Sequence, residues 1–264
     1  MIAIDIDGTL LNSEGRVPDE NIRALDLARD RGVHIVLATG RPPAGIARIR
    51  AQMSDPPDEY QIAFSGALTR LARTGESVSS HTITAGDYLE IAAFAEEYGL
   101  DHYGYQEDAC LSPVLHPVVL WERDINGVRI IKTELSALDV HLPLMKAMAT
   151  GDPDKIRFAL SRIPETFTRR FSIVSSAMNL LEFHHPKATK GQAVRELAAI
   201  LGICREEIIC IGDSGNDIDM IRYAGLGVAM DNATDEVKAA ADFITAANDN
   251  GGVAEVVRRY IINE

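Results

Sequence analysis

Asp5 and Asp7 stand two positions apart, directly after the apolar start of the chain, in the sequence IAIDIDGTLL at residues 2–11. In an extended strand, residues i and i+2 point to the same face, and Gly8 permits a turn just after them. One carboxylate could then attack an electrophile while the other serves the leaving group. Aspartates are also common at strand ends and in turns, so the pair alone is weak evidence for catalysis.

Two later strands also end in polar residues, and one helix begins with a lysine. These residues are Thr39, Gly40 and Arg41 after the strand at 33–38, Asp213, Asn216 and Asp217 after the strand at 207–211, and Lys190 at the start of the helix at 190–202. Ligands of parallel α/β sheets bind beyond the carboxyl ends of the strands. The sequence therefore predicts that these residues join the aspartate pair in one site.

Such a site would concentrate the negative charges of Asp5, Asp7, Asp213 and Asp217. A hard divalent cation would compensate them, and ligands that are all oxygen favour Mg²⁺ over Zn²⁺. Because Mg²⁺ commonly binds substrate phosphate as well, the metal indicates phosphoryl transfer, which requires positioning and charge neutralisation. The predicted donors to the phosphate or substrate are Thr39, the Gly40 amide, Arg41, Lys190 and Asn216.

The elements that must position these residues alternate between strand and helix at both ends of the chain. Predicted strands at 2–5, 33–38, 61–65 and 207–211 are separated by predicted helices at 18–32, 43–53, 190–202 and 216–225. Such alternation implies parallel strands with right-handed crossovers. We therefore expect an α/β fold with a doubly wound, mainly parallel, Rossmann-like core.

The middle of the chain has a different pattern, typical of an inserted α+β domain. Predicted helices lie at 87–98 and near 138–149, and predicted strands lie at 101–105, 128–133, 155–160, 171–176 and 179–184. We predict a catalytic core formed by residues 1–78 and 187–264 and an inserted cap domain at residues 79–186.

Composition narrows the class of partner. The 264-residue chain has a formal net charge of −13, which disfavours binding to nucleic acid or to an anionic membrane. Three cysteines without metal-ligand spacing fit a reducing compartment. With no basic leader and no apolar stretch long enough to span a bilayer, we expect a cytoplasmic protein, monomeric or homodimeric, that acts on a small molecule.

Several motifs together resemble the haloacid dehalogenase superfamily, and more narrowly its Cof-type phosphatases, which carry a large α/β cap. These motifs are DIDGTLL, LATGR, LEFHHPKATKG, IGDSGNDIDMI and GVAMDNATDEVKAAADFIT. The resemblance implies that Asp5 is a nucleophile that forms an aspartyl-phosphate and that Asp7 is the acid/base. It also implies that Lys190 neutralises charge, and that Mg²⁺ is held by Asp5, the Asp7 backbone carbonyl and Asp213, with Asp217 in support.

The same resemblance implies that Thr39, Gly40 and Asn216 bind the transferring phosphoryl group and that the cap selects the leaving group. Members often carry Asn before a glycine after the third core strand, where this chain has Ser65 and Gly66. The candidates for substrate contact in the cap are Tyr103, Tyr105, His116, His184 and His185.

Three functions fit this reading. The first is a Mg²⁺-dependent phosphatase of small phosphorylated metabolites, either sugar phosphates or a cofactor phosphate. A phosphomutase or phosphotransferase on the same scaffold differs only in how well water is excluded. A non-catalytic binding module, for instance a phosphorylated sensor with a receiver-like acidic site, is disfavoured, because Asp7, Lys190 and the long insertion would then have no purpose.

Overall fold

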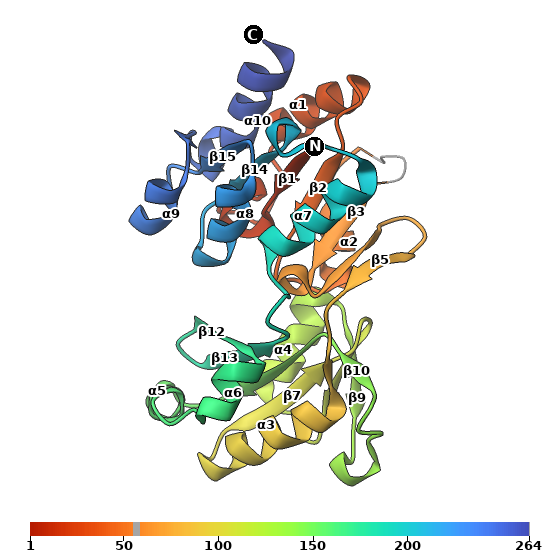
Figure 1. The fold of residues 1–264 in the computed structure, drawn as a ribbon, viewed down its shortest axis with the longest axis vertical. Helices are drawn as coiled ribbons and strands as arrows, with labels where there is room; N and C mark the ends of the chain where they lie inside the picture. Colours follow the sequence, from red (N-terminus) through yellow and green to blue (C-terminus); the bar gives the residue numbers. More distant parts are fainter. Residues whose placement is uncertain (55–58, 264) are drawn as a thin grey trace. The chain divides into compact units, whose positions relative to one another are not determined.

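The computed structural model describes residues 1–54 and 59–263, and the chain divides into two compact units. The core unit comprises Met1–Arg41, Ile46–Ser80 and Thr189–Glu264, and the inserted unit comprises Pro42–Gly45 and His81–Ala188. Figure 1 shows that the two ends of the chain supply the strands and helices of the core unit.

An eight-stranded sheet forms the centre of the core unit, in the order β16-β15-β14-β1-β2-β3-β4-β5. The strands are β1 (Ile2–Ile4), β2 (Ile35–Ala38), β3 (Tyr60–Ala63), β4 (Leu68–Leu71), β5 (Ser77–Ser80), β14 (Ile209–Gly212), β15 (Leu226–Ala229) and β16 (Phe243–Ile244). Pairing is parallel from β16 to β3, and β4 and β5 add an antiparallel edge. The carboxyl ends of the parallel strands therefore share one edge.

Helices cover the two faces of this sheet. They are α1 (Asp19–Asp30), α7 (Lys190–Leu201), α8 (Ile218–Tyr223), α9 (Asp235–Ala240) and α10 (Gly252–Val257). Helix α2 (Pro43–Arg50) begins in the segment Pro42–Gly45 of the inserted unit and continues in the core unit. Val194 and Leu197 of α7 pack with Ala3 of β1 and Val36 of β2 in one apolar cluster. The alternate residues of these strands point to the opposite face and are also buried, as expected for parallel strands with continuous apolar sequences.

The inserted unit is built on a six-stranded sheet in the order β12-β13-β11-β7-β8-β9, with β6 and β10 as a separate pair. The strands are β6 (Ile83–Thr84), β7 (Asp101–Tyr105), β8 (Ala109–Ser112), β9 (Arg129–Lys132), β10 (Pro143–Leu144), β11 (Lys146–Thr150), β12 (Ser172–Ala177) and β13 (Leu180–His184). The helices are α3 (Ala85–Glu97), α4 (Pro117–Asn126), α5 (Pro153–Leu160) and α6 (Glu165–Arg170).

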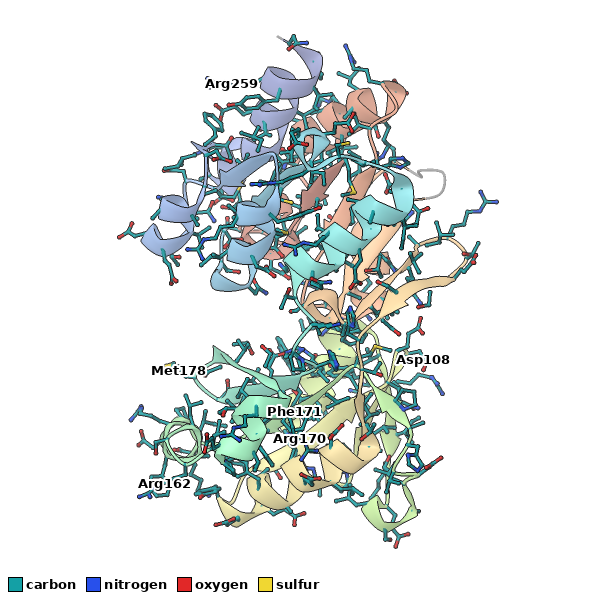
Figure 2. All side chains as sticks on the ribbon, viewed as in Figure 1. Asp108, Arg162, Arg170, Phe171, Met178 and Arg259 are labelled. Atoms are coloured by element: carbon teal, nitrogen blue, oxygen red, sulfur yellow. The ribbon has the colours of Figure 1, made fainter. Side chains whose placement is uncertain are left out.

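The apolar core of the inserted unit contains a cluster of phenylalanine side chains. Phe94, Phe167, Phe171 and Phe183 form mutual ring contacts at centroid distances of 5.5–6.5 Å. Figure 2 labels Phe171 together with Arg170, whose guanidinium lies 5.0 Å from the centre of the Phe171 ring. This cluster attaches helices α3 and α6 to one face of the sheet.

The predicted fold class, a doubly wound and mainly parallel core with an α+β insertion, is confirmed, but two elements of the insertion were predicted wrongly. Residues 138–149 are not a helix, because they contain β10 and β11. The run KAMAT favours a helix, yet β11 is paired on both sides in the middle of its sheet, and these tertiary contacts override local propensity.

The segment at 155–160 is not a strand but the greater part of α5. Asp152 accepts a hydrogen bond from the Asp154 N–H, and Pro153 occupies the first turn, so the helix start signal lies just before the segment. Across the described residues, no helix combines the length and the apolar character that crossing a bilayer would require.

Candidate active site

Asp5 lies directly after β1, in the middle of the core sheet, and its side chain is buried. The chain then turns at Gly8, which has a φ of +82°. A Cβ atom at Gly8 would lie 2.5 Å from Asp213 Oδ2, so the close approach of this turn to Asp213 requires glycine. The hydroxyl of Thr9 donates to Asp213 Oδ1 over 2.7 Å, which fixes the carboxylate against the turn.

Three carboxylates meet at this point. Asp5, Asp213 and Asp217 each offer an oxygen, and these oxygens lie within 4.8 Å of one another. The fully buried Nζ of Lys190 donates to Asp5 Oδ1 and to Asp217 Oδ1, both over 2.6 Å. The structure therefore brings the first residue of α7 to the ends of β1 and β14, as the sequence predicts.

The charges of the cluster are not balanced, because three carboxylates face one ammonium group. Burial raises the pKa of Asp5, against the opposing effect of Lys190. Burial also raises the pKa of Asp213, although the Thr9 hydroxyl opposes it. For Lys190, burial alone would lower the pKa, but Asp5 and Asp217 outweigh it and raise the pKa. A set of oxygen donors with excess negative charge fits a hard divalent cation.

Both oxygens of the Asp217 carboxylate are engaged. Oδ1 accepts from Lys190, and Oδ2 accepts the backbone N–H groups of Asp213 and Ser214 over 3.1 and 3.0 Å. A Cβ atom at Gly212 would lie 2.4 Å from the Asp217 Cβ, so these residues are tightly packed. This arrangement makes Asp217 a support for the loop that carries Asp213.

The end of β2 and the loop after β3 lie beside the start of α7. Phe64 and Ser65 have φ values of 51° and 55°, and Gly66 has a φ of +103°. A Cβ atom at Gly66 would lie 2.2 Å from the Thr189 carbonyl oxygen, one residue before Lys190. Among non-glycine residues, Asn tolerates the left-handed region best, whereas this chain places Ser65 there with a φ of 55°.

Thr39 and Gly40, the predicted phosphate ligands, lie next to this loop. Thr39 is buried, and its hydroxyl accepts the Arg41 N–H over 3.2 Å. A Cβ atom at Gly40 would lie 3.3 Å from Ser65 Oγ, so the two turns are in close contact. The role of these residues toward phosphate stays a prediction.

Arg41 forms a two-point ion pair with Asp7. Its Nε donates to Asp7 Oδ2 and its Nη2 donates to Asp7 Oδ1, each over 2.7 Å. The Asp7 side chain is 56% exposed, whereas the Arg41 side chain is only 20% exposed. From the sequence, Arg41 is expected to bind phosphate or substrate, and no residue pattern indicates its pairing with Asp7.

Asn216, also predicted to bind phosphate, is exposed, and its Oδ1 accepts the Ser214 hydroxyl over 2.7 Å. No contact that the structure describes joins Asn216 to Asp5 or Lys190. Its role is therefore still a prediction from the motif.

Two residues that hold the site were missed. Thr9 fixes Asp213, and Asn232 Nδ2 donates to the Gly8 carbonyl over 2.8 Å. Asn232 follows β15, so the rule that polar residues gather after parallel strands would have identified it. Thr9 carries no comparable signal, because threonine is common in turns.

The tyrosines predicted to contact substrate are buried in the inserted unit. Tyr103 and Tyr105 pack edge to face with a centroid distance of 5.9 Å. The Tyr103 hydroxyl donates to Glu122 over 3.3 Å, and burial raises the pKa of Tyr103. These contacts give Tyr103 a packing role that needs no substrate.

The predicted histidines of the inserted unit also have local partners. His116 Nδ1 accepts a backbone N–H at the start of α4, and the His184 ring lies 3.1 Å from Glu182. His185 stacks on His81 with a centroid distance of 5.4 Å. Contact of these residues with substrate stays a prediction.

Comparison with known proteins gives full-length matches. A sequence model of the family described as haloacid dehalogenase-like hydrolase matches residues 2–257. The Bacillus subtilis protein YxeH, a candidate phosphatase by name, is 34% identical over 273 aligned residues, which cover 99% of this chain and 98% of the relative. The 5-amino-6-(5-phospho-D-ribitylamino)uracil phosphatase YcsE of the same organism is 31% identical, with coverage of 99% and 96%.

A solved structure leads to the same family. The crystal structure of a haloacid dehalogenase-like hydrolase from Bacteroides thetaiotaomicron superimposes with a TM-score of 0.88 at 30% identity, over 98% of each chain. The predicted enzyme class, a hydrolase of the phosphatase type, agrees with these matches, and the predicted superfamily is confirmed. The sequence matches, the fold and the carboxylates at the strand ends agree with one another. This protein belongs to the haloacid dehalogenase-like hydrolase family.

Proposed function

We propose that the protein is a Mg²⁺-dependent phosphatase that hydrolyses monoesters of small phosphorylated metabolites through an aspartyl-phosphate on Asp5. The observation that carries this proposal is the bridge from Lys190 to both Asp5 and Asp217 in a buried cluster with Asp213. A purely structural core would rarely hold three carboxylates and one ammonium group, because unbalanced buried charge is strongly unfavourable.

In the first step, a carboxylate oxygen of Asp5 forms a bond to phosphorus while the bond from phosphorus to the leaving oxygen breaks. Asp7 gives its proton to that oxygen, so the product leaves as an alcohol. In the second step, water attacks phosphorus and passes a proton to Asp7. The bond between phosphorus and Asp5 breaks, which releases inorganic phosphate and restores both aspartates.

Lys190 has two tasks in this scheme. Its ammonium group holds the Asp5 carboxylate in place, as the 2.6 Å contact indicates. It also reduces the repulsion between that carboxylate and the incoming phosphate dianion. Thr39, the Gly40 amide and Asn216 would donate to the non-bridging oxygens of the phosphoryl group that is transferred.

Asp5 and Asp213, together with the backbone carbonyl of Asp7, would hold Mg²⁺, with Asp217 in support. A bound Mg²⁺ supplies positive charge that neutralises the phosphoryl oxygens. The residues fit this ion because all candidate side-chain ligands are carboxylates.

The substrate class follows from the insertion and from one relative. The relative YcsE is named for a phosphate monoester of a ribityl chain, a sugar alcohol. For the present chain, we propose a substrate of similar chemistry, either a sugar phosphate or the phosphate monoester of a cofactor. Residues 79–186 would select the leaving group, and residues 1–78 and 187–264 would carry the chemistry.

Release of inorganic phosphate from 4-nitrophenyl phosphate tests the proposal. We expect turnover with Mg²⁺, none with EDTA, and none in Asp5→Asn. Release in water without any sugar acceptor separates a phosphatase from a phosphotransferase. Full activity of Asp5→Asn would overturn the assignment of the nucleophile.

A further inference from the structure

Arg41 holds Asp7 by both oxygens of the carboxylate. We propose that Arg41 is a positioning residue, which fixes the Asp7 carboxyl group in the orientation needed for proton transfer. This inference rests on the proposed function, because it gives Arg41 a task in the acid/base step. It differs from the phosphate-binding role that the sequence suggests.

The geometry of the pair supports positioning. A guanidinium group is planar, and its two parallel N–H···O bonds fix both the place and the plane of a carboxylate. Asp7 needs such a restraint, because its side chain is 56% exposed. Within the described residues, Arg41 supplies both of the hydrogen bonds to this carboxylate.

The backbone of Arg41 is itself well anchored. Its N–H donates to the Thr39 hydroxyl over 3.2 Å, and its carbonyl oxygen accepts the Phe64 N–H over 3.1 Å. Phe64 belongs to the left-handed turn whose third residue packs on Thr189. The guanidinium therefore extends from a backbone that is tied to the same turn as Lys190.

Proton transfer depends strongly on orientation, because the acid must reach the leaving oxygen at hydrogen-bond distance. An alkoxide leaving group needs this proton, whereas 4-nitrophenolate is stable enough to leave without it. Loss of Arg41 should therefore slow the hydrolysis of an alkyl ester much more than that of 4-nitrophenyl phosphate. Loss of a phosphate ligand would slow both esters equally, since the phosphoryl group is the same.

The experiment measures the ratio of kcat for n-pentyl phosphate to kcat for 4-nitrophenyl phosphate in Arg41→Lys and Arg41→Met. We expect both variants to lower this ratio about ten- to a hundredfold, a part of the roughly hundred- to ten-thousandfold that general acid catalysis supplies. Lysine keeps the positive charge but lacks the fork, so it should not rescue the ratio. Because both rates come from one preparation, partial unfolding does not change the ratio.

The matched control is Arg48→Lys and Arg48→Met, at an exposed arginine of α2. These variants should keep the wild-type ratio. A double-mutant cycle with Asp7→Asn is the second measurement. If Arg41 acts through Asp7, adding Arg41→Met to Asp7→Asn should not lower kcat for n-pentyl phosphate further.

Two results would overturn the inference: an equal loss for both esters with a raised KM, or multiplicative losses in the cycle. Either result would assign Arg41 to the phosphate instead. A wild-type protein that hydrolyses neither ester fails in a different way, since it overturns the proposed function itself. The two failures are therefore distinguishable.

Discussion

Lys190 Nζ lies 2.6 Å from Asp5 Oδ1, although the two residues are 185 positions apart in the chain. Both groups are buried, and the same ammonium group also pairs with Asp217. Breaking a buried ion pair on one side leaves charge without compensation, which is far more damaging than the loss of a surface pair.

We expect Lys190→Met to lower the free energy of unfolding by about 3–5 kcal/mol, because Asp5 and Asp217 would stay buried without their counter-charge. Urea unfolding in EDTA, followed by circular dichroism, measures this loss. Lys187→Met is the control, since Lys187 is exposed and its removal should change stability by less than about 0.5 kcal/mol. Equal losses in the two variants would contradict the prediction.

In the metal-free protein, Asp213 should make the folding stability depend on pH. Its pKa is raised, chiefly by burial, so the folded state keeps this proton where the unfolded chain has lost it. Stability from Asp213 is therefore lost as the pH rises from about 4, the usual aspartate value, through the raised folded value. Asp213→Asn in EDTA should show a smaller loss over this window.

Mg²⁺ should oppose this loss of stability with rising pH. It would bind the ionised carboxylates, and only the folded state brings these carboxylates together. The increase in the urea midpoint caused by Mg²⁺ should therefore grow with pH in the wild-type protein. It should be reduced in Asp213→Asn. An equal increase in both proteins would exclude Asp213 as a ligand.

Adding a single methyl group at Gly66 should strongly reduce both stability and activity. A Cβ atom there would lie 2.2 Å from the Thr189 carbonyl oxygen, so Gly66→Ala should displace the start of α7 and with it Lys190. We expect loss of activity and a fall in stability well above the ~1–2 kcal/mol of left-handed strain alone.

Gly15→Ala is the matched control for Gly66→Ala. Gly15 also has a positive φ, of +73°, but nothing lies within 4 Å of the Cβ position. Gly15→Ala should lose only the stability that the strain of a positive φ costs, and its activity should stay at the wild-type level. Similar melting temperatures for the two variants would refute the role given to close packing at Gly66.

The buried Glu182 should make the folding stability of the inserted unit sensitive to acid. Burial alone would raise the pKa of Glu182, but Lys146 and His184 outweigh it and hold the pKa well below its usual range. The resulting stability is present above about pH 4.3, the unfolded value, and is lost as the pH falls toward the lower folded value.

Glu182→Gln should flatten this acid-side slope, whereas Glu97→Gln, at an exposed glutamate, should leave it unchanged. Fluorescence of Trp121 is a suitable measurement, because this is the single tryptophan of the chain and it lies in α4 of the inserted unit. A slope unchanged by Glu182→Gln would show that the Lys146 pair does not contribute to acid stability.

The carboxylate cluster could be predicted from the sequence because the rule that finds it is local. Each aspartate follows a strand that is visible as an apolar run, and parallel strands end at one edge of a sheet. Lys190 could be added because the amphipathic pattern of residues 190–202 places it at the start of a helix. The pairing of Arg41 with Asp7 could not be predicted, because it depends on where two side chains point after the fold is made.

The inserted unit was harder to predict for a related reason. β11 has helix-favouring residues and becomes a strand through pairing with β7 and β13, which contribute more than local propensity. Thr9 was missed because threonine is common in turns and nothing in the sequence marks its contact with Asp213.

Pairing between β1 and β14 sets an order of events during synthesis. Ile2 pairs with Ile209, so the strand that precedes Asp5 gains this neighbour only after the residues of β14 have left the ribosome. Until then Asp5 has neither its lysine nor the other carboxylates, and it is an ordinary hydrated side chain. Residues 81–188, complete before Lys190 is made, can fold meanwhile. The proposed nucleophile, Asp5, is therefore made long before β14 and Lys190, and the carboxylate cluster forms only after these later elements have been synthesised.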